Sequence, residues 1–496
     1  MIELIPLWLL SLVGVVVADA FARPGPAQEG RVIRFVRGLW ITGLVASTLF
    51  GSVLALSGNP DLAAFLTVGL AGLFTFASNA KRRVLGEPLV FSDLALLGAM
   101  VKHPQFYFSV LALWQQVLGA FALLIAIGVV AWLMEPSVTK AIAGSAIAAT
   151  GAAVLMLSVR LGPWRHLARE PGLNSDVATL GLVPTLLLYW MRWRQARSRL
   201  LDQGSPASQD ALAGERKAGS SDELIVVVQC ESFADPTEVF AQGGISLPQL
   251  GRAKRRSAQW GNLLVSGFGA YTMRTEYGVL FGRDESELGF LLYDPYLTAQ
   301  IDPARALPQK LGADRWHSLF VHPHDMRFYG RNEILPKAGF DELIGEGRFP
   351  EPEPPRGRYE RAAAVAAKRM ELARAASGPA LIYAVTMENH GPWAPHGDAS
   401  TASLISNYNR LVLAGDAMLG QLMEGFDRVD RPVTLVFFGD HRPTIPGASD
   451  PGGDRYTPYV IVPSGSRCSE PSEPPERVDL TPARLHQAIL DRAAKL

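Results

Sequence analysis

The sequence predicts an α-helical transmembrane bundle followed by an α/β domain with a mostly parallel central sheet. Three observations lead to this fold class. Several uncharged runs follow one another before residue 191. Charged residues become frequent after that point, as in a water-soluble domain. In the C-terminal part, short β-branched runs alternate with helical stretches, a pattern typical of a parallel sheet covered by helices.

The overall composition is balanced in charge and poor in cysteine. The chain has 496 residues, with 47 basic and 47 acidic side chains, so no excess charge indicates a nucleic acid or an acidic partner. The cysteines, Cys230 and Cys468, cannot by themselves form a disulfide scaffold or a zinc cluster. The first apolar run lacks a basic start and a small-residue cleavage site, so we expect it to be retained as an anchor.

Uncharged runs in the N-terminal part are candidate membrane spans, and we place the transmembrane bundle, of about five helices, at residues 1–160. A bilayer core needs about 20 apolar residues per helix, a length that every run except the first meets well. A large buried helical core is the alternative, but so many long runs in succession favour membrane helices. The runs comprise residues 4–18, 38–60, 62–80, 106–134 and 141–159.

A further apolar stretch, residues 177–191, has two interpretations. It contains Pro184 and precedes aromatic and basic residues, which suits a helix lying at the membrane interface, but it could also be a short sixth span. Basic residues cluster after the first, third and fifth runs, so the positive-inside rule places those loops in the cytoplasm. With five spans the C-terminal domain would then be cytoplasmic, and with six it would lie outside.

A polar stretch separates the two parts of the chain. Residues 195–223 are rich in Ser, Ala, Gly and charge, so we interpret 161–222 as a juxtamembrane helix and linker and 223–496 as the second domain. Residues 224–230 form a continuous β-branched run, as in a buried parallel strand. Further strands are expected at 318–322, 380–386, 433–438 and 459–462, with helices such as 361–376 and 406–426 between them.

Polar side chains follow the predicted strands where each one ends. Binding sites in parallel sheets form beyond the carboxyl ends of the strands. Glu231 follows the first strand, and Asp440 and His441 follow the fourth. Two carboxylates and an imidazole suit a divalent cation such as Mn²⁺, Mg²⁺ or Zn²⁺. Each residue alone also fits a turn or a helix start, so the prediction depends on the joint pattern.

A threonine between the first two strands completes the candidate site. Thr272 follows a glycine-rich segment and precedes a predicted helix start, which favours an anionic phosphoryl group. A threonine hydroxyl is a poor nucleophile, but coordination to a divalent cation lowers its pKa. Thr275 is a nearby competitor. His390 follows the third strand and could be structural; for His322 and His324, after the second strand, we favour a packing role.

Taken together, these motifs resemble the lipoteichoic acid synthase family of phosphoglycerol transferases, within the sulfatase and alkaline phosphatase superfamily. The resemblance covers the whole chain and implies a sulfatase-like catalytic domain at residues 223–496. The Glu-Ser-Phe, Thr-Met-Arg-Thr-Glu-Tyr and Gly-Asp-His segments match the family's metal and nucleophile motifs. The resemblance implies Thr272 as the nucleophile and selects it over Thr275. The metal ligands that it implies are Glu231, Thr272, Asp440 and His441.

The resemblance also implies substrate contacts, with one departure. His390, in Asn-His-Gly-Pro-Trp, and Arg331, in Phe-Tyr-Gly-Arg, match residues of the family that contact substrate. His390 would protonate the leaving oxygen, and Arg331 would hold a phosphate oxygen. The family usually has a small residue after the nucleophile, whereas Met273 and Arg274 stand here. Arg274 could bind phosphate or indicate a different donor.

The function implied by the resemblance is transfer of a phosphoglycerol-type group from a membrane phospholipid, such as phosphatidylglycerol, to a glycan or glycolipid acceptor. A phospho-threonine intermediate and one divalent ion, with Mn²⁺ the first expectation, belong to this mechanism. The expected location is the bacterial inner membrane, multi-pass, with an extracytoplasmic catalytic domain. With five spans and an extracytoplasmic domain, residues 177–191 would be a helix that lies on the membrane surface. This arrangement conflicts with the positive-inside rule, which places the domain in the cytoplasm when there are five spans.

Other functions are compatible with the same plan. An arylsulfatase would need a Cys/Ser-x-Pro-x-Arg motif, which neither Cys230, Cys468 nor the segment around Thr272 supplies. A phosphoethanolamine transferase shares the anchor and the threonine nucleophile, but such enzymes typically carry several disulfides. A sulfatase-fold phosphodiesterase or hydrolase is a further alternative. A protein that has lost catalysis is disfavoured by the complete set of motif residues.

Overall fold

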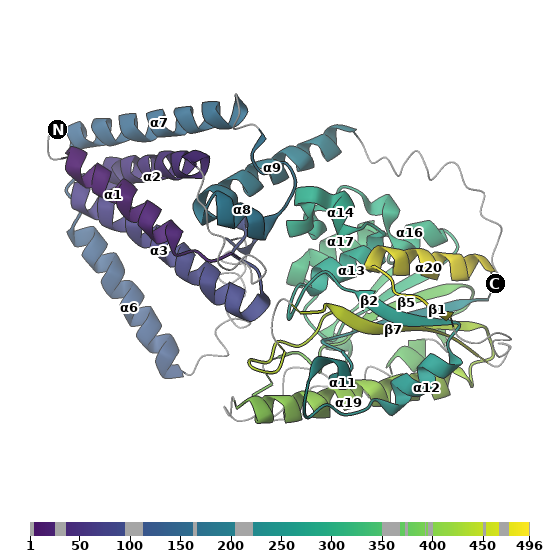
Figure 1. Ribbon diagram of the computed structural model, residues 1–496. Helices are drawn as coiled ribbons and strands as arrows, with labels where there is room; N and C mark the ends of the chain where they lie inside the picture. Colours follow the sequence, from purple (N-terminus) through teal and green to yellow (C-terminus); the bar gives the residue numbers. More distant parts are fainter. Residues whose placement is uncertain are drawn as a thin grey trace. The chain divides into compact units, whose positions relative to one another are not determined.

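The chain folds into two compact units, residues 1–196 and 197–496, in a computed structural model (Figure 1). The structure describes residues 4–24, 36–94, 113–161, 166–203, 222–349, 368–372, 375–391, 393–394, 400–449, 453–465 and 476–495. Parts of the predicted run 106–134, linker 195–223 and helix 361–376 therefore lie outside the described residues, as does Cys468.

The N-terminal unit consists of apolar helices, as the sequence predicts. Among the described residues, α2, α3 and α7 are long and apolar enough to cross a membrane, and α1 and the Val117–Trp132 part of α6 are shorter apolar helices. The helices of this region are α1 (Leu4–Ala20), α2 (Val36–Ser57), α3 (Pro60–Leu85), α6 (Leu113–Trp132), α7 (Val138–Arg160), α8 (Leu173–Thr179) and α9 (Leu182–Gln203).

Small residues allow α2 and α7 to pack closely. A Cβ atom at Gly144 would lie 2.4 Å from the backbone nitrogen of Ala55, and one at Gly51 would lie 2.5 Å from that of Ala148. No larger side chain fits between the two helices at these points. Close approach over small residues is a common way for membrane helices to associate, because lipid supplies no hydrophobic driving force between them.

The apolar stretch 177–191 is interrupted in the structure. It includes the end of α8 and the beginning of α9, which are separated by Gly181 with a φ of +106°. The carboxylate of Asp19 accepts a hydrogen bond of 2.8 Å from the backbone N–H of Val183 in the first turn of α9. Pro184 lies in the same turn, where a missing N–H does not weaken the helix. The number of spans and the side of the second unit stay predictions.

The second unit is built on one mixed sheet with the strand order β4-β3-β5-β1-β6-β7-β2-β8. Of the described strands, only β7 runs antiparallel to its neighbours, so the predicted α/β fold class with a mostly parallel sheet is confirmed. The strands are β1 (Leu224–Cys230), β2 (Gln259–Leu264), β3 (His317–Val321), β4 (Glu342–Ile344), β5 (Ala380–Val385), β6 (Val433–Gly439), β7 (Tyr456–Ser464) and β8 (Glu476–Arg477).

Helices cover both faces of the sheet: α13 and α20 lie on one face, and α11, α12 and α19 lie on the other (Figure 1). The α-helices of this unit are α11 (Pro236–Val239), α12 (Pro248–Arg256), α13 (Thr272–Phe281), α14 (Glu285–Leu288), α15 (Pro295–Ala299), α16 (Leu307–Leu311), α17 (Arg331–Lys337), α19 (Thr401–Phe426) and α20 (Pro482–Lys495). Short 3-10 helices span Gly289–Tyr293, Pro303–Arg305, Phe328–Gly330 and Glu346–Arg348.

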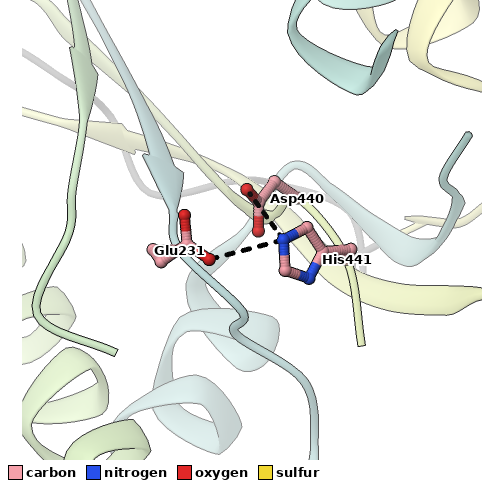
Figure 2. A group of neighbouring side chains, drawn as sticks. All are labelled: Glu231, Asp440 and His441. Carbon is pink, nitrogen blue, oxygen red and sulfur yellow. Dashed lines mark ion pairs between the residues drawn. The ribbon is translucent and has the colours of Figure 1, made fainter. Parts of the chain in front are cut away.

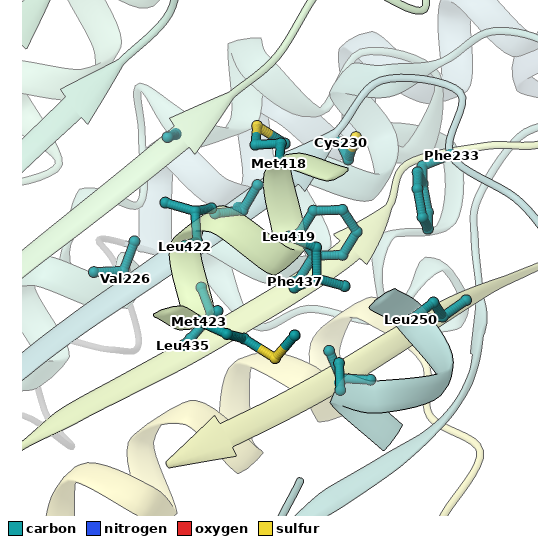
Figure 3. Close-up of a cluster of buried hydrophobic side chains, with 14 of the residues drawn as sticks. Val226, Cys230, Phe233, Leu250, Met418, Leu419, Leu422, Met423, Leu435 and Phe437 are labelled. Atoms are coloured by element: carbon teal, nitrogen blue, oxygen red, sulfur yellow. The ribbon is translucent and has the colours of Figure 1, made fainter. Parts of the chain in front are cut away.

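The main core lies between the sheet and α19 (Figure 3). Alternate residues of β1, such as Val226 and Val228, face this layer, as the two-residue period of a strand requires. They meet Leu419 and Leu422 of α19, which are fully buried. This packing makes β1 and β6 a rigid support for whatever follows their carboxyl ends.

A carboxylate on α19 fixes the beginning of α12. Asp416 is buried, and its two oxygens accept hydrogen bonds from the backbone N–H groups of Gln249 at 2.9 Å and Leu250 at 2.7 Å. These N–H groups have no partner within their own helix, so an acidic group here stabilises the helix start. Asp416 therefore holds α19 and α12 together.

Candidate active site

The carboxyl ends of β1 and β6 bring the predicted metal ligands together. Cys230 pairs with Gly439 in the last register position of the two strands. Glu231 follows one strand and Asp440 and His441 follow the other, so the three side chains emerge at one edge of the sheet (Figure 2). All three are buried, and one ligand atom from each lies within 4.8 Å of the others.

The imidazole of His441 is oriented toward the two carboxylates. Its Nε2 lies 3.3 Å from Oε1 of Glu231 and 3.7 Å from Oδ2 of Asp440 (Figure 2). Its Nδ1 lies 3.2 Å from the carbonyl oxygen of Arg442. An Nδ1–H that donates to this carbonyl leaves the Nε2 lone pair directed into the cluster, the arrangement found for histidines that bind metals.

Ser232 connects all three ligands, and sequence reasoning missed it. Its backbone N–H donates to Oδ1 of Asp440 at 2.8 Å, and its hydroxyl donates to Oε1 of Glu231 at 2.8 Å. The same hydroxyl lies 3.4 Å from Nδ1 of His441. Ser232 has a φ of +47°, an uncommon conformation for a residue with a side chain. Such backbone strain is typical of functional sites. The Glu-Ser-Phe motif was the available signal.

The electrostatics of the cluster fit a divalent cation. Burial, together with the charge of Glu231, raises the pKa of Asp440 to about 6. Burial by itself lowers the pKa of His441, but the two carboxylates outweigh it and raise that pKa. Oδ2 of Asp440 is buried without a hydrogen-bond partner of normal geometry. A buried carboxylate oxygen without a partner is costly, and a cation held by these oxygen and nitrogen donors would satisfy it.

The structure separates the two candidate threonines. Thr272 is the first residue of α13 and is partly exposed. A hydrogen-bonding contact from its side chain acts to lower the pKa of Asp440, so its hydroxyl lies beside the cluster. Thr275 is fully buried and donates its hydroxyl to the backbone carbonyl of Asp440 at 3.0 Å. Thr275 is therefore a structural residue, and of these two threonines Thr272 is the one whose hydroxyl is available at the site.

Two glycines are required by the close approach of chain segments at the site. A Cβ at Gly439, the last residue of β6, would lie 1.8 Å from the carbonyl oxygen of Phe233. Gly269 has a φ of +66°, and a Cβ there would lie 1.7 Å from Oγ1 of Thr444. Gly439 therefore lets the segment after β1 pack against the end of β6, and Gly269 lets the segment before Thr272 pack against the segment after His441.

Arg331 lies in a buried ion pair. Its Nη2 is 2.7 Å from Oε2 of Glu276, its Nε is 3.0 Å from Oε1, and its Nη1 is 3.2 Å from Nε2 of His322. The Tyr296 hydroxyl donates to the same Glu276 carboxylate. Glu276 lies one helical turn after Thr272 on α13. These contacts enclose the guanidinium: Arg331 is 1% exposed and Glu276 is 0% exposed.

The remaining predicted residues lie around this centre. His390 is exposed after β5, and its Nδ1 lies 2.6 Å from the carbonyl oxygen of Gly391. His322 is buried, and burial lowers its pKa well below the ordinary value. Burial also lowers the pKa of His324, with smaller contributions from Arg331 and His390. Arg274 is buried on α13 with its guanidinium carbon 3.9 Å from the ring centre of Tyr271.

If the cluster holds a divalent ion, we expect Asp440→Ala to contain much less metal than the wild type, because the cluster would retain one carboxylate and one imidazole. Elemental analysis of the purified full-length protein after dialysis measures this. Asp416→Ala is the matched control, since it removes a buried carboxylate that caps α12 and that bonds no member of the cluster in the described part of the chain. Equal metal content in the Asp440 variant and the wild type would contradict a metal centre here.

A family model described as Sulfatase matches residues 223–488, more than half of the chain. The protein therefore belongs to the sulfatase family. The matched region comprises the whole sheet and all the residues of the cluster. The complete chain is also similar to the capsular polysaccharide biosynthesis protein RkpI of Rhizobium meliloti (strain 1021). The two are 29% identical over 98% of this chain and 94% of that protein.

Two solved structures are similar in fold. The integral membrane protein lipooligosaccharide phosphoethanolamine transferase A of Neisseria meningitidis aligns with a TM-score of 0.51 and 13% identity, over 98% of this chain and 94% of that one. The Streptococcus pyogenes phosphoglycerol transferase GacH, in complex with sn-glycerol-1-phosphate, aligns with a TM-score of 0.45 and 16% identity, over 61% of this chain and 81% of that one. The first likeness extends over the apolar helices as well as the sheet, so this protein shares the two-part fold of that integral membrane protein.

Proposed function

We propose that this protein is a membrane-anchored, metal-dependent transferase that moves a phosphoglycerol-type group from a membrane phospholipid to a glycan or glycolipid acceptor. The observation that carries the proposal is the position of Thr272. Its hydroxyl begins a helix and lies beside Asp440 in a buried cluster suited to a divalent cation. A nucleophile, a cation site and a helix N-terminus at one point favour attack on a phosphoryl group.

In the first step, Oγ of Thr272 attacks phosphorus and its proton passes to water. The bond between phosphorus and the diacylglycerol oxygen breaks, and His390, which is exposed, protonates that leaving oxygen. A divalent ion such as Mn²⁺, held by Glu231, Asp440 and His441, would favour the deprotonated hydroxyl and offset the phosphoryl charge. The products are diacylglycerol and a phosphoglycerol ester of Thr272.

In the second step, a hydroxyl of the acceptor attacks the same phosphorus. His390, now unprotonated, takes the proton of that hydroxyl, and the bond between phosphorus and Oγ of Thr272 breaks. Thr272 recovers a proton from water, and the enzyme returns to its first state. The donor product leaves before the acceptor reacts, so ping-pong kinetics follow.

The arginines have different roles in this proposal. Arg331 is enclosed by Glu276 and His322, so we assign it a positioning role instead of the phosphate contact that the motif suggests. By bonding Glu276, Arg331 holds α13 in place one helical turn after Thr272. Arg274 lies in the first turn of the same helix and remains a candidate for an anionic contact, but it lines a cavity on another face of α13 than Thr272.

The choice of donor depends on the sequence motifs, which resemble phosphoglycerol transferases. RkpI is named for capsular polysaccharide biosynthesis, which supports a glycan as the acceptor. Phosphoethanolamine is the second candidate group, because the full-length fold is shared with a phosphoethanolamine transferase. Phosphoethanolamine transferases typically carry several disulfides, whereas Cys230 is a free, buried cysteine, and this difference argues against the second candidate. A hydrolase of the same fold would use water in the second step.

The deciding experiment is incubation of the full-length protein with labelled phosphatidylglycerol or phosphatidylethanolamine, followed by mass spectrometry of the peptide that contains Thr272. We expect the added mass of phosphoglycerol on this residue. An added phosphoethanolamine would select the second candidate, and an unmodified Thr272 with both lipids would exclude the proposed intermediate. Release of free glycerol phosphate without an acceptor would indicate a hydrolase.

We also propose that the catalytic unit lies on the extracytoplasmic side of the bacterial inner membrane. Lipid-borne donors and glycan acceptors of a cell envelope are both accessible there. A reporter fused after Arg199 tests this, because alkaline phosphatase is active only outside the cytoplasm and a fluorescent protein that folds only in the cytoplasm reports the reverse. A cytoplasmic signal from this fusion would exclude the proposed side.

A further inference from the structure

A second candidate binding site lies within the catalytic unit, behind the nucleophile helix. It is a cavity of about 480 Å³ whose wall includes the end of β2, α13, α14 and the beginning of α20. Its volume is in the range of small-ligand sites. The helices approach closely at its base, since a Cβ at Gly278 would lie 2.6 Å from Cβ of Pro482. None of the metal-cluster residues lines it.

The cavity and the metal cluster lie on different faces of α13. Thr272, Thr275 and Glu276 are spaced three and four residues apart, so they share one face of the helix, and the cluster lies there. Arg274 and Gly278 are four residues apart, share another face and line the cavity. A ligand in the cavity would therefore contact the nucleophile helix without occupying the metal cluster.

Positive charge dominates the cavity. Four arginines line it, against the two carboxylates of Asp284 and Glu285. Arg455 and Arg484 are exposed side chains, and no ion pair is formed by either within the described part of the chain. Guanidinium groups present forks of N–H donors that match phosphate and carboxylate oxygens. Two such groups facing one cavity indicate an anionic ligand.

The rest of the lining indicates what kind of anion fits. Ser266, Ser286 and Thr481 contribute hydroxyl groups, which can exchange hydrogen bonds with the hydroxyls of a sugar or polyol. Leu264 and Leu288 supply apolar surface, against which the carbon skeleton of a saccharide ring can pack. A bare inorganic anion would use only the arginines, whereas an acidic saccharide would use all three kinds of surface.

We propose that this cavity binds an acidic saccharide, with the phosphate or carboxylate group of the sugar between Arg455 and Arg484. The inference deepens the proposed function, because it makes the glycan acceptor an anionic one held on the nucleophile helix. Binding itself needs no transfer step. It can therefore be measured when Thr272 is inactive and no metal is present.

The test is a saturation-transfer NMR titration of the full-length protein in detergent micelles, with EDTA present so that the metal cluster takes no phosphate. The probes are glucose 1-phosphate, glucuronic acid and glucose. We expect one or both acidic sugars to bind and glucose to bind much more weakly. In Arg455→Gln/Arg484→Gln, binding of the acidic sugar should weaken by about tenfold to a hundredfold, since two charge-assisted contacts are lost.

Two further variants make the outcome decisive. Arg410→Gln removes an exposed arginine on α19 that bonds only Asn407 among the described contacts, and it should bind like the wild type. Thr272→Ala should also bind like the wild type, which distinguishes this site from the proposed transfer. Unchanged affinity in the double arginine variant, or equal binding of glucose and the acidic sugars, would overturn the proposal. Failure to form the Thr272 adduct while this binding persists would reject only the proposed function.

Discussion

Thr272→Ala is expected to reduce turnover by roughly 10⁶-fold, as removal of a covalent nucleophile does in other enzymes. Alanine removes the hydroxyl that would attack phosphorus. The two neighbouring hydroxyls do not replace it, because both are buried: Thr275 donates to the carbonyl of Asp440, and Ser232 donates to the carboxylate of Glu231. Diacylglycerol release from labelled phosphatidylglycerol measures turnover. The adduct on the Thr272 peptide should disappear with it.

The controls separate lost chemistry from lost structure. Thr272→Ser keeps a hydroxyl at the start of α13 and should retain measurable turnover and the adduct. Thr272→Ala should still bind the metal ion, because Glu231, Asp440 and His441 are unchanged. Thr275→Ser keeps the hydrogen bond to Asp440 and should have little effect. Normal turnover in Thr272→Ala would contradict the proposed mechanism.

The clustering of Glu231, Asp440 and His441 was predictable because it depends on local sequence and on one general property of sheets. Adjacent parallel strands end at the same edge, so Glu231 and the Asp440–His441 pair could be placed together without a structure. The strands themselves are short β-branched runs, and β1 and β6 are buried along their whole length. Sequence pattern is most informative for such strands.

The edge of the sheet was not predictable in the same way. β2 has the sequence Gln-Trp-Gly-Asn-Leu-Leu and is only partly buried, so it shows neither a continuous apolar run nor a strict alternation. β4 and β8 have three and two residues, too few for a periodic signal. The antiparallel direction of β7 depends on how its connections run in space, which its own residues do not specify.

The pairing of charged side chains that are distant in the chain could not be predicted from the sequence either. The motif around Arg331 indicates a residue that contacts substrate, yet the structure directs its guanidinium to Glu276, 55 residues earlier. Glu276 belongs to the Thr-Met-Arg-Thr-Glu-Tyr segment, which indicates the nucleophile but not the partner of this glutamate. The left-handed backbone of Ser232 is likewise a consequence of tertiary contacts, since its N–H and hydroxyl satisfy ligands from two strands.

Glu276→Ala is expected to destabilise the second unit, residues 197–496, by about 3–5 kcal/mol, because it leaves the Arg331 guanidinium buried without its partner. The side chains of the pair are 0% and 2% exposed, so water cannot replace the lost carboxylate. Thermal unfolding of the purified full-length protein measures the effect. Since Glu276 also fixes the helix that begins at Thr272, any folded fraction should show reduced turnover.

Two comparisons test the physical reason for this loss. Glu424→Ala breaks an ion pair of similar length with Arg252, 2.8 Å between Nη1 and Oε1, but those side chains are 54% and 37% exposed, so the cost should stay below about 1 kcal/mol. Glu276→Leu combined with Arg331→Met replaces both buried charges with apolar groups and should recover much of the stability. If the Glu276 and Glu424 variants lost equal stability, burial would not be the cause. If the double variant were no more stable than Glu276→Ala, the unpaired guanidinium would not be the cause either.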